Sequence, residues 1–270
     1  MSVTVIKVGG AAVDRAHEVP QLWQGLVRLH QAQRIVIVHG GGGAVDELFG
    51  MLGIPVEKQR GIRVTPAEHV GHVVSVLAGS VSAELCGAIN RAAEQTLAVG
   101  MTVTSAGLVC ELDDSYGFDV GRVGRVANDA GEAKALHALL DTELLPVIAC
   151  VGLDRDGLAL NINGDDAAAS VAGTIRADRL VLLTDVAGIL DADGMILDEV
   201  RETRITQLIE DGTIHGGMIP KVRAAMTASA AARAPVVIAS WKDPDVFDAI
   251  AQGRRVGTII HSPISQKSTP

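Results

Sequence analysis

Aromatic side chains are scarce in this chain, which has 2% Phe, Trp and Tyr against 48% hydrophobic residues. The core must therefore be built mainly from Ala, Val, Ile and Leu. Few rings are left on which nucleic-acid bases could stack, and a formal net charge of -9 repels a phosphate backbone. We expect no nucleic-acid partner, and an anionic substrate would have to be attracted by local positive groups.

Cysteines and long apolar runs are also few. Cys86, Cys110 and Cys150 form no C-x-x-C pair, which argues against a disulfide framework or a zinc site, so we expect reduced and mostly buried thiols. The N-terminus enters a strand directly and lacks the basic region and long apolar segment of a signal peptide. No apolar run approaches the length of a membrane span. We therefore expect a cytoplasmic protein without a membrane partner.

A metal site held by protein side chains is not expected either. Glu68, His69 and His72 are close in sequence, but a third ligand of suitable spacing is missing. A solvated helix face explains these three residues better.

What the sequence does contain is a run of four glycines, Gly40 to Gly43, after the buried strand 35–38 and before an apolar and acidic segment that reads as a helix. Glycines let backbone N–H groups approach a ligand closely, and a helix N-terminus favours negative charge. The pattern predicts a cradle for phosphate or another oxyanion. A tight turn that binds nothing is the simpler alternative, but four glycines cost backbone entropy without adding packing.

The glycine run matches neither of the two common phosphate-binding loops. A P-loop requires Gly-Lys-Ser or Gly-Lys-Thr, which occurs nowhere in the chain. The dinucleotide fingerprint G-x-G-x-x-G fails because its third glycine would fall on Val45 or Asp46. The cradle therefore belongs to another class.

Alternating strands and helices predict an α/β sandwich with a mostly parallel sheet. Ligands then bind at the carboxyl ends of the strands, where Lys7, Gly40 to Gly43, Asp165 and Asp185 fall. We further expect two helices within 67–98 broken near Gly79, and a loose tail after Ser262. The expected strands are 3–8, 35–38, 101–112, 122–126, 145–151, 158–162, 180–183, 236–239 and 256–260.

Several polar residues stand at positions where a ligand would be held. Lys7 interrupts an apolar strand and is followed by two glycines, which favours a ligand contact over a surface lysine at a sheet edge. Arg63 precedes a helix start and is either a solvated arginine or a fork for a carboxylate. Asn161 and Asn163 alternate onto one face, and Asp165 reaches the start of the next helix, where it is either a cap or a functional carboxylate.

Taken together, KVGG, VHGGGGAVDEL, GIRVTP, NINGDDAA, LLTDVAGIL, GGMIPKV and VGTII resemble the amino-acid kinase superfamily, over residues 3 to 260. The first and fifth motifs are shared widely there, whereas GIRVTP, NINGDDAA and GGMIPKV are most similar to the acetylglutamate kinase branch. The resemblance implies an open αβα sandwich of the carbamate-kinase-like fold. It also implies an N-terminal lobe of about 1–175 for the amino-acid substrate and a C-terminal lobe of about 176–261 for the nucleotide.

The activity that the resemblance implies is ATP-dependent phosphorylation of the side-chain carboxylate of N-acetyl-L-glutamate in arginine biosynthesis. The cofactor Mg2+ would be bound through ATP. A homodimer without arginine feedback is expected, because the N-terminal extension of the arginine-inhibited hexamers is missing. Two alternatives remain: a sister kinase that phosphorylates an aminoadipate derivative on a carrier protein, and a sensor that binds a metabolite without turnover. GIRVTP argues against the first alternative, and the presence of Lys7, Lys221 and Asp165 argues against the second.

By the same resemblance, Lys7 and Lys221 stabilise the transferring phosphoryl group, and Asp165 holds both lysines. Substrate contacts would come from Gly41, Gly42, Arg63, Asn161 and Asn163. Nucleotide contacts would come from Gly9, Gly10, Thr184, Asp185, Val186, Ala187, Gly188, Ile189, Leu190, Thr213, Ile214 and His215. The chain departs from the family pattern at Ser82 (usually Asn), at 104–107 (usually Gly-Asp-Gly) and at Gly164 (usually Ala), and these departures concern the acceptor end of the site.

Overall fold

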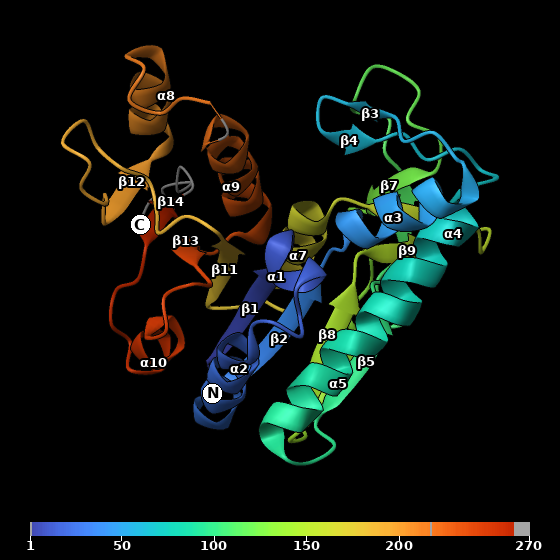
Figure 1. The fold of residues 1–270 in the computed structure, drawn as a ribbon, viewed down its shortest axis with the longest axis horizontal. Helices are drawn as coiled ribbons and strands as arrows, with labels where there is room; N and C mark the ends of the chain where they lie inside the picture. The colour runs from blue at the N-terminus through green and yellow to red at the C-terminus, as the bar shows by residue number, and fades with distance from the viewer. Residues whose placement is uncertain (1, 217, 262–270) are drawn as a thin grey trace, which may run out of the picture.

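An eight-stranded sheet runs through the centre of the molecule (Figure 1). Neighbouring strands are parallel except for β13 and β14. In spatial order the strands are β12 (Glu199–Arg201), β14 (Thr258–His261), β13 (Val236–Ser240), β11 (Arg179–Thr184), β1 (Val3–Val8), β2 (Arg34–His39), β8 (Leu145–Ala149) and β5 (Ala98–Thr102). The computed structural model describes residues 2–216 and 218–261, so the predicted loose tail lies outside the described residues.

Helices cover both faces of this sheet, as the αβα prediction requires. One group, α2, α5 and α10, packs together, and α7 packs closely on α9 in a second group. The sandwich around a mostly parallel sheet is therefore confirmed. The helices are α1 (Ala11–Asp14), α2 (Pro20–Ala32), α3 (Gly42–Leu52), α4 (Val70–Val74), α5 (Ser82–Ala93), α6 (Lys134–Leu140), α7 (Gly164–Thr174), α8 (Glu202–Glu210), α9 (Met218–Ala232) and α10 (Val246–Ala251).

The central strands are buried on both faces, which explains why they read as continuous aliphatic runs. Although aromatic residues are few, three of them, Trp23, Phe49 and Phe247, are among the largest buried side chains of the core. The cysteines are free, with Cys110 and Cys150 buried and Cys86 half-buried. This confirms the expectation of reduced and mostly buried thiols.

A smaller sheet lies beside the main one and differs from the prediction. It contains β6 (Cys110–Leu112), β7 (Val123–Val126), β10 (Ala159–Ile162) and β9 (Val151–Leu153) in spatial order. The predicted strand 145–151 therefore splits, since β8 ends in the main sheet and β9 begins in the smaller one. The predicted strand 101–112 splits in the same way, into β5 and β6. Burial on both sides makes these segments read as one apolar run, and only pairing separates them.

The structure contains a short hairpin, β3 (Lys58–Gln59) and β4 (Ile62–Arg63), that the sequence analysis does not predict. Its turn residues, Arg60 and Gly61, both have positive φ, 50° and 85°. This is the backbone that a tight two-residue hairpin turn requires. The hairpin stands above α3 in Figure 1, together with the loop that precedes β7.

The segment from Val70 to Ala93 is one continuous helix, so the predicted break near Gly79 is wrong. Its middle turn, Ser75–Val81, is a π-helix (η1) between α4 and α5. A π turn absorbs one extra residue without ending the helix, and such turns are frequent at functional sites. Here it brings Leu77 and Val81 against the glycine loop, because a Cβ on Gly41 would lie 2.9 Å from the Leu77 side chain.

Within the described residues, this same helix is the one that is long and apolar enough to cross a membrane by length and composition. The expectation that no apolar stretch approaches the length of a membrane span is therefore wrong for Val70–Ala93. The helix packs against α2, β5 and β8, which is the environment of a core helix.

The contact between α7 and α9 depends on the absence of a side chain at Gly173. A Cβ at this position would lie 2.7 Å from the carbonyl oxygen of Ala231, which is backbone and gives way poorly. We predict that Gly173→Ala lowers the free energy of unfolding by about 1–3 kcal/mol, measured by urea denaturation. Gly50→Ala, in α3 where a Cβ meets nothing within 4 Å, should leave it unchanged or raise it by up to about 1 kcal/mol. Equal effects of the two variants would contradict this packing argument.

Candidate active site

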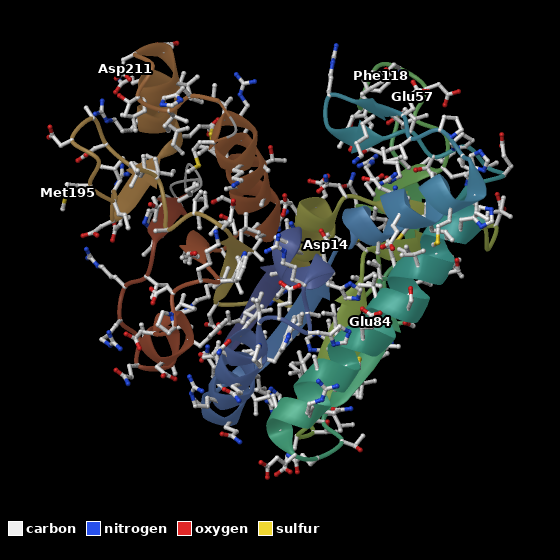
Figure 2. All side chains as sticks on the ribbon, in the orientation of Figure 1. Asp14, Glu57, Glu84, Phe118, Met195 and Asp211 are labelled. Atoms are coloured by element: carbon white, nitrogen blue, oxygen red, sulfur yellow. The ribbon has the colours of Figure 1, made fainter. Side chains whose placement is uncertain are left out.

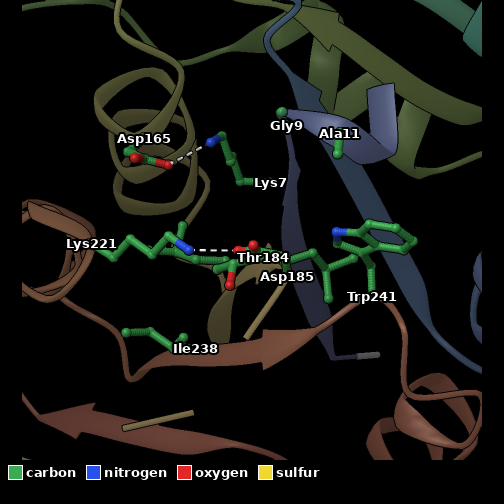
Figure 3. Close-up of a pocket in the computed structure, with 12 residues that line it drawn as sticks. Lys7, Gly9, Ala11, Asp165, Thr184, Asp185, Lys221, Ile238 and Trp241 are labelled. Atoms are coloured by element: carbon green, nitrogen blue, oxygen red, sulfur yellow. Dashed lines mark hydrogen bonds and ion pairs between the residues drawn. The ribbon is translucent and has the colours of Figure 1, made fainter. Parts of the chain in front are cut away.

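Two cavities lie at the carboxyl ends of the central strands. The first, which we name the lysine cavity, has a volume of about 350 Å³. It contains both predicted catalytic lysines and the predicted catalytic aspartate (Figure 3). Its lining residues are Lys7, Gly9, Gly10, Ala11, Asp165, Leu182, Leu183, Thr184, Asp185, Lys221, Ile238 and Trp241.

The second cavity, which we name the glycine cavity, has a volume of about 240 Å³. It collects the glycine loop, the hairpin and the two predicted asparagines. Its lining residues are Gly40, Gly41, Gly42, Val45, Lys58, Gly61, Ile62, Arg63, Val73, Leu77, Val123, Cys150, Asn161, Ile162, Asn163 and Gly164.

The two cavities meet at Lys7 and Gly164. A Cβ added to Gly164 would lie 3.3 Å from Lys7 Cε and 4.0 Å from the Gly40 backbone. Gly164 is one of the departures from the family pattern. The missing methyl group leaves space beside the lysine stem, between the linings of the two cavities.

The two lysines are held by different carboxylates in this structure. Lys7, at the end of β1, forms an ion pair with Asp165 at 3.0 Å, and both side chains are mostly buried. Lys221, in α9, donates a hydrogen bond to Asp185 at 2.5 Å (Figure 3). This bond holds the pKa of Asp185 below its ordinary value. Asp165 and Lys221 line the same cavity, but the structure gives Asp165 the first lysine alone as its ionic partner among the described residues.

The start of α7 is capped by Asn163, so the alternative that Asp165 is the cap is excluded. The Asn163 side-chain oxygen accepts hydrogen bonds from the backbone N–H groups of Asp165 and Asp166. Asn161, two residues earlier, donates from its amide to the Thr65 hydroxyl at 3.1 Å. Both asparagines line the glycine cavity, as their predicted common face requires. Asp165 is left free of capping and directs its carboxylate at Lys7.

Arg63 is fixed from several sides, which settles the alternative of a solvated arginine. Its Nη2 donates to the Gly42 carbonyl at 2.9 Å, its Nη1 lies 2.6 Å from Asp46 Oδ1, and its guanidinium lies over the Phe49 ring. Asp46 also pairs with Lys58 at 2.8 Å. Burial alone would raise the pKa of Asp46, but hydrogen bonds and charge from the two basic groups outweigh it and lower that pKa.

Sequence reasoning missed four residues at or beside the site. Lys58 and Asp46 are linked to Arg63, and the Arg-Gly turn of the hairpin was the signal that would have found them. Trp241 lines the lysine cavity just beyond the end of β13, where strand ends collect ligand contacts. Asp14, in the middle of the molecule in Figure 2, reaches the glycine loop, since a Cβ on Gly43 would lie 2.7 Å from its carboxylate. No sequence signal marked that contact.

Several predicted nucleotide contacts do not line either cavity. Of the segment 184–190, only Thr184 and Asp185 reach the lysine cavity, whereas Ile189 is a core residue. Leu190 is exposed. The segment 213–215 lies in the connection between α8 and α9, with the Ile214 side chain buried and that of His215 exposed.

Metal ligands are not clustered in the part of the chain that the structure describes: no group of three or more His, Cys, Asp or Glu side chains is positioned to hold an ion. His69 and His72 instead lie edge-on to the Phe49 ring. Two carboxylates, Asp165 and Asp185, line the lysine cavity separately.

The arrangement suits the transfer of an anionic group between two anions. One cavity carries two lysines, the other carries an arginine, a lysine and a glycine loop at the N-terminus of α3, and Lys7 stands where they meet. No histidine lines either cavity among the described residues, so the site offers positive charge and backbone N–H groups more than an acid or base.

The chain belongs to the amino acid kinase family, whose family model matches residues 2–240. It is 38% identical over 266 residues to the acetylglutamate kinase of Edwardsiella ictaluri (strain 93-146), covering 97% of this chain and 100% of that protein.

Solved structures agree on the fold. The crystal structure of smu.665 from Streptococcus mutans UA159 matches 96% of this chain and 98% of that chain, with a TM-score of 0.73 and 28% identity. Carbamate kinase from Giardia lamblia bound to AMP-PNP matches 97% and 98%, with a TM-score of 0.69 and 21% identity. At 21% identity, the similarity to the carbamate kinase shows a common fold and nothing more.

Asp166 generates a prediction about stability. Burial, followed by the charges of Asp165 and Asp113, raises the pKa of its carboxyl from 3.8 to about 6. The native state therefore binds more protons than the unfolded state between about pH 4 and pH 6. Stability contributed by the protonated group is lost as pH rises through that window, and the loss is complete above about pH 6.

We predict that Asp166→Asn raises the free energy of unfolding at pH 7.5 by about 1–2 kcal/mol, after allowance for solvent screening. The gain should shrink as pH falls toward 4.5, because the native carboxyl is then already neutral. Urea denaturation at the two pH values measures this. Asp114→Asn, an exposed site in the neighbouring loop, is the matched control and should have little effect at either pH. A gain that is the same at both pH values would contradict the prediction.

Proposed function

We propose that this protein is an acetylglutamate kinase, which transfers the γ-phosphoryl group of ATP to the side-chain carboxylate of N-acetyl-L-glutamate. The observation that carries the proposal is Lys7, which stands between a cavity with a second lysine and a cavity with the glycine loop and Arg63. Membership of the family and 38% identity over nearly the whole length of an acetylglutamate kinase support the same conclusion. The comparisons do not favour the carrier-protein kinase or the sensor. A role in arginine biosynthesis, in the cytoplasm, is part of the same proposal.

In the proposed reaction, a carboxylate oxygen of the acceptor forms a bond to the γ-phosphorus while the bond to the leaving ADP oxygen breaks. The carboxylate is already ionised, so no proton has to be removed from it. This agrees with a site without a catalytic histidine. The products are an acyl phosphate and ADP.

The protein's task in this reaction is positioning and charge stabilisation. At roughly 4 Å and an effective dielectric near 20, one lysine offers on the order of 4 kcal/mol against an opposing charge. Lys7 and Lys221 would act on the transferring group, and Asp165 would hold Lys7. Mg²⁺ bound through ATP would neutralise phosphate charge, with Asp165 and Asp185 as the carboxylates that line its side of the site.

The two substrates would occupy the two cavities. ATP phosphates would lie against Gly9, Gly10 and the lysines, with Thr184 and Asp185 beside them. The acceptor would lie in the glycine cavity, its reacting carboxylate on the N–H groups of Gly41 and Gly42 and its other end on Arg63 and Asn161. The glycine cavity lies wholly within the proposed lobe of about 1–175, whereas the lysine cavity takes its lining from both that lobe and the lobe of about 176–261. Val186 to Leu190 and Thr213 to His215 would take part only through the adenosine end of ATP.

A homodimer is proposed from the free edge of the main sheet. β5 is the last strand there, and it lies beside the helix that runs from Val70 to Ala93. Only 44% of the most apolar stretch of that helix is buried within the chain. A second copy would cover the outer face of the helix, where exposed small residues such as Gly79, Ala83 and Gly87 leave room for close approach.

The first test is turnover with ATP, Mg²⁺ and a panel of N-acetylglutamate, glutamate, aspartate and N-acetylaminoadipate, in which hydroxylamine traps the acyl phosphate. We expect a clear preference for N-acetylglutamate, because the glycine cavity is small and polar at both ends. Absence of turnover on every acceptor, with ATP still bound, would sink the proposed function and return the sensor as the better reading.

The lysine and aspartate roles predict a kinetic signature. Lys221→Ala and Asp165→Ala should each lower kcat by about 10²–10³-fold with a much smaller change in either KM, because they act on charge that develops during transfer. Lys134→Ala, whose side chain is 86% exposed, is the control and should match the wild type. If both site variants changed KM alone, these two role assignments would be wrong.

A further inference from the structure

His39 is a buried histidine directly before the glycine loop, and it lines neither cavity. It is the last residue of β2 and is 0% exposed. Its Nδ1 lies 2.8 Å from the carbonyl oxygen of Gly40. A carbonyl oxygen only accepts hydrogen bonds, so Nδ1 must carry the proton and donate it.

The other ring nitrogen shows that this histidine is neutral. Nε2 is buried and has no hydrogen-bond partner among the described residues. Protonating it would bury an unpaired N–H together with a charge, which is costly. Burial accordingly lowers the pKa of His39, although the hydrogen bond to Gly40 acts in the opposite direction. The ring is therefore a fixed donor and not a titrating group at neutral pH.

This hydrogen bond sets the direction of the next backbone N–H. The peptide between Gly40 and Gly41 is trans, as are all peptides in the described residues. The C=O and N–H of a trans peptide point in opposite directions from one plane. When the buried His39 ring holds the Gly40 carbonyl, the Gly41 N–H faces away from the ring, and Gly41 itself lines the glycine cavity. In residues 2–216 and 218–261 this N–H donates to no protein acceptor.

Without the histidine, little would fix this peptide. Glycine stands on both sides of it, so neither flank carries a Cβ that restricts rotation. Gly41 has φ 152° and ψ 37°, and a Cβ there would lie 2.9 Å from Leu77. The loop therefore has no space for a side chain at Gly41 that would restrict rotation of the peptide. The Gly40 N–H is bonded to the Val8 carbonyl at 3.2 Å, which anchors the residue but leaves its carbonyl free to turn.

We propose that His39 is a positioning residue for the phosphoryl transfer: its Nδ1–H holds the Gly40 carbonyl and thereby aims the Gly41 N–H at the anion in the glycine cavity. The inference rests on the proposed function for its catalytic consequence, whereas the hydrogen-bond geometry stands apart from it. His39 touches neither substrate and acts through the glycine backbone.

Three variants separate this role from simple packing. In His39→Asn the amide nitrogen takes the place of Nδ1 and keeps the donor. In His39→Gln the amide nitrogen takes the place of Nε2, and in His39→Leu no donor remains. We expect His39→Gln and His39→Leu to lower kcat about 100-fold, the loss typical of one transition-state donor, with a small change in the KM for ATP. His39→Asn should recover most of that loss.

A spectroscopic measurement tests the geometry without turnover. In protein labelled with ¹⁵N-histidine, His39 should show the Nδ1–H tautomer and be neutral at pH 7, with its signals assigned by their absence in His39→Asn. Thermal unfolding by circular dichroism reports whether each variant folds, and His39→Gln, which keeps polarity and size, serves if His39→Leu does not.

The outcomes are decisive in either direction. The Nδ1–H tautomer with rescue by asparagine supports the proposal. The Nε2–H tautomer, a charged ring at pH 7, wild-type kcat in folded His39→Leu, or equal losses in the asparagine and leucine variants would each overturn it. If wild-type protein phosphorylates no acceptor, the proposed function fails, and the tautomer still decides whether His39 orients the loop.

Discussion

Two anions react only if positive groups hold them together, and this constraint explains the place of Lys7. The lysine is the penultimate residue of the central strand β1, between β11 and β2, and its side chain lines the lysine cavity beside Gly164 of the glycine cavity. Asp165 fixes it at 3.0 Å from the start of α7. The chain as a whole carries a net charge of -9, so the attraction for anionic ligands must come from these few local groups.

The surrounding structure serves to keep those groups in place. Asn163 caps α7 and leaves the Asp165 carboxylate free for the lysine, while Asp46 ties Arg63 and Lys58 of the hairpin to α3. Lys7, Arg63 and Lys58 are thus each held by a carboxylate from a helix. Such pairs cost side-chain entropy that a flexible surface lysine would keep, and in return the charge is already oriented before a ligand arrives.

Glycine provides the other half of the site. The loop before α3 exposes backbone N–H groups, and the π turn of the long helix packs two aliphatic side chains, Leu77 and Val81, against it. The buried ring of His39 bonds to the Gly40 carbonyl of the same loop. A flexible segment becomes a rigid one because its neighbours, and not its own side chains, restrict it.

The sequence by itself determined the order of strands and helices, the parallel sheet and the gathering of Lys7, the glycine loop and Asp165 at one edge, because aliphatic runs, glycines and strand ends are local signals. It did not determine the partner of Lys221, the hairpin of Lys58 and Arg63, the uninterrupted helix through Gly79, or the exclusion of 186–190 from the cavity. Those depend on which distant segments pack together. Ion pairs and cavity walls form between residues that the chain separates by tens of positions, so only the tertiary structure decided them.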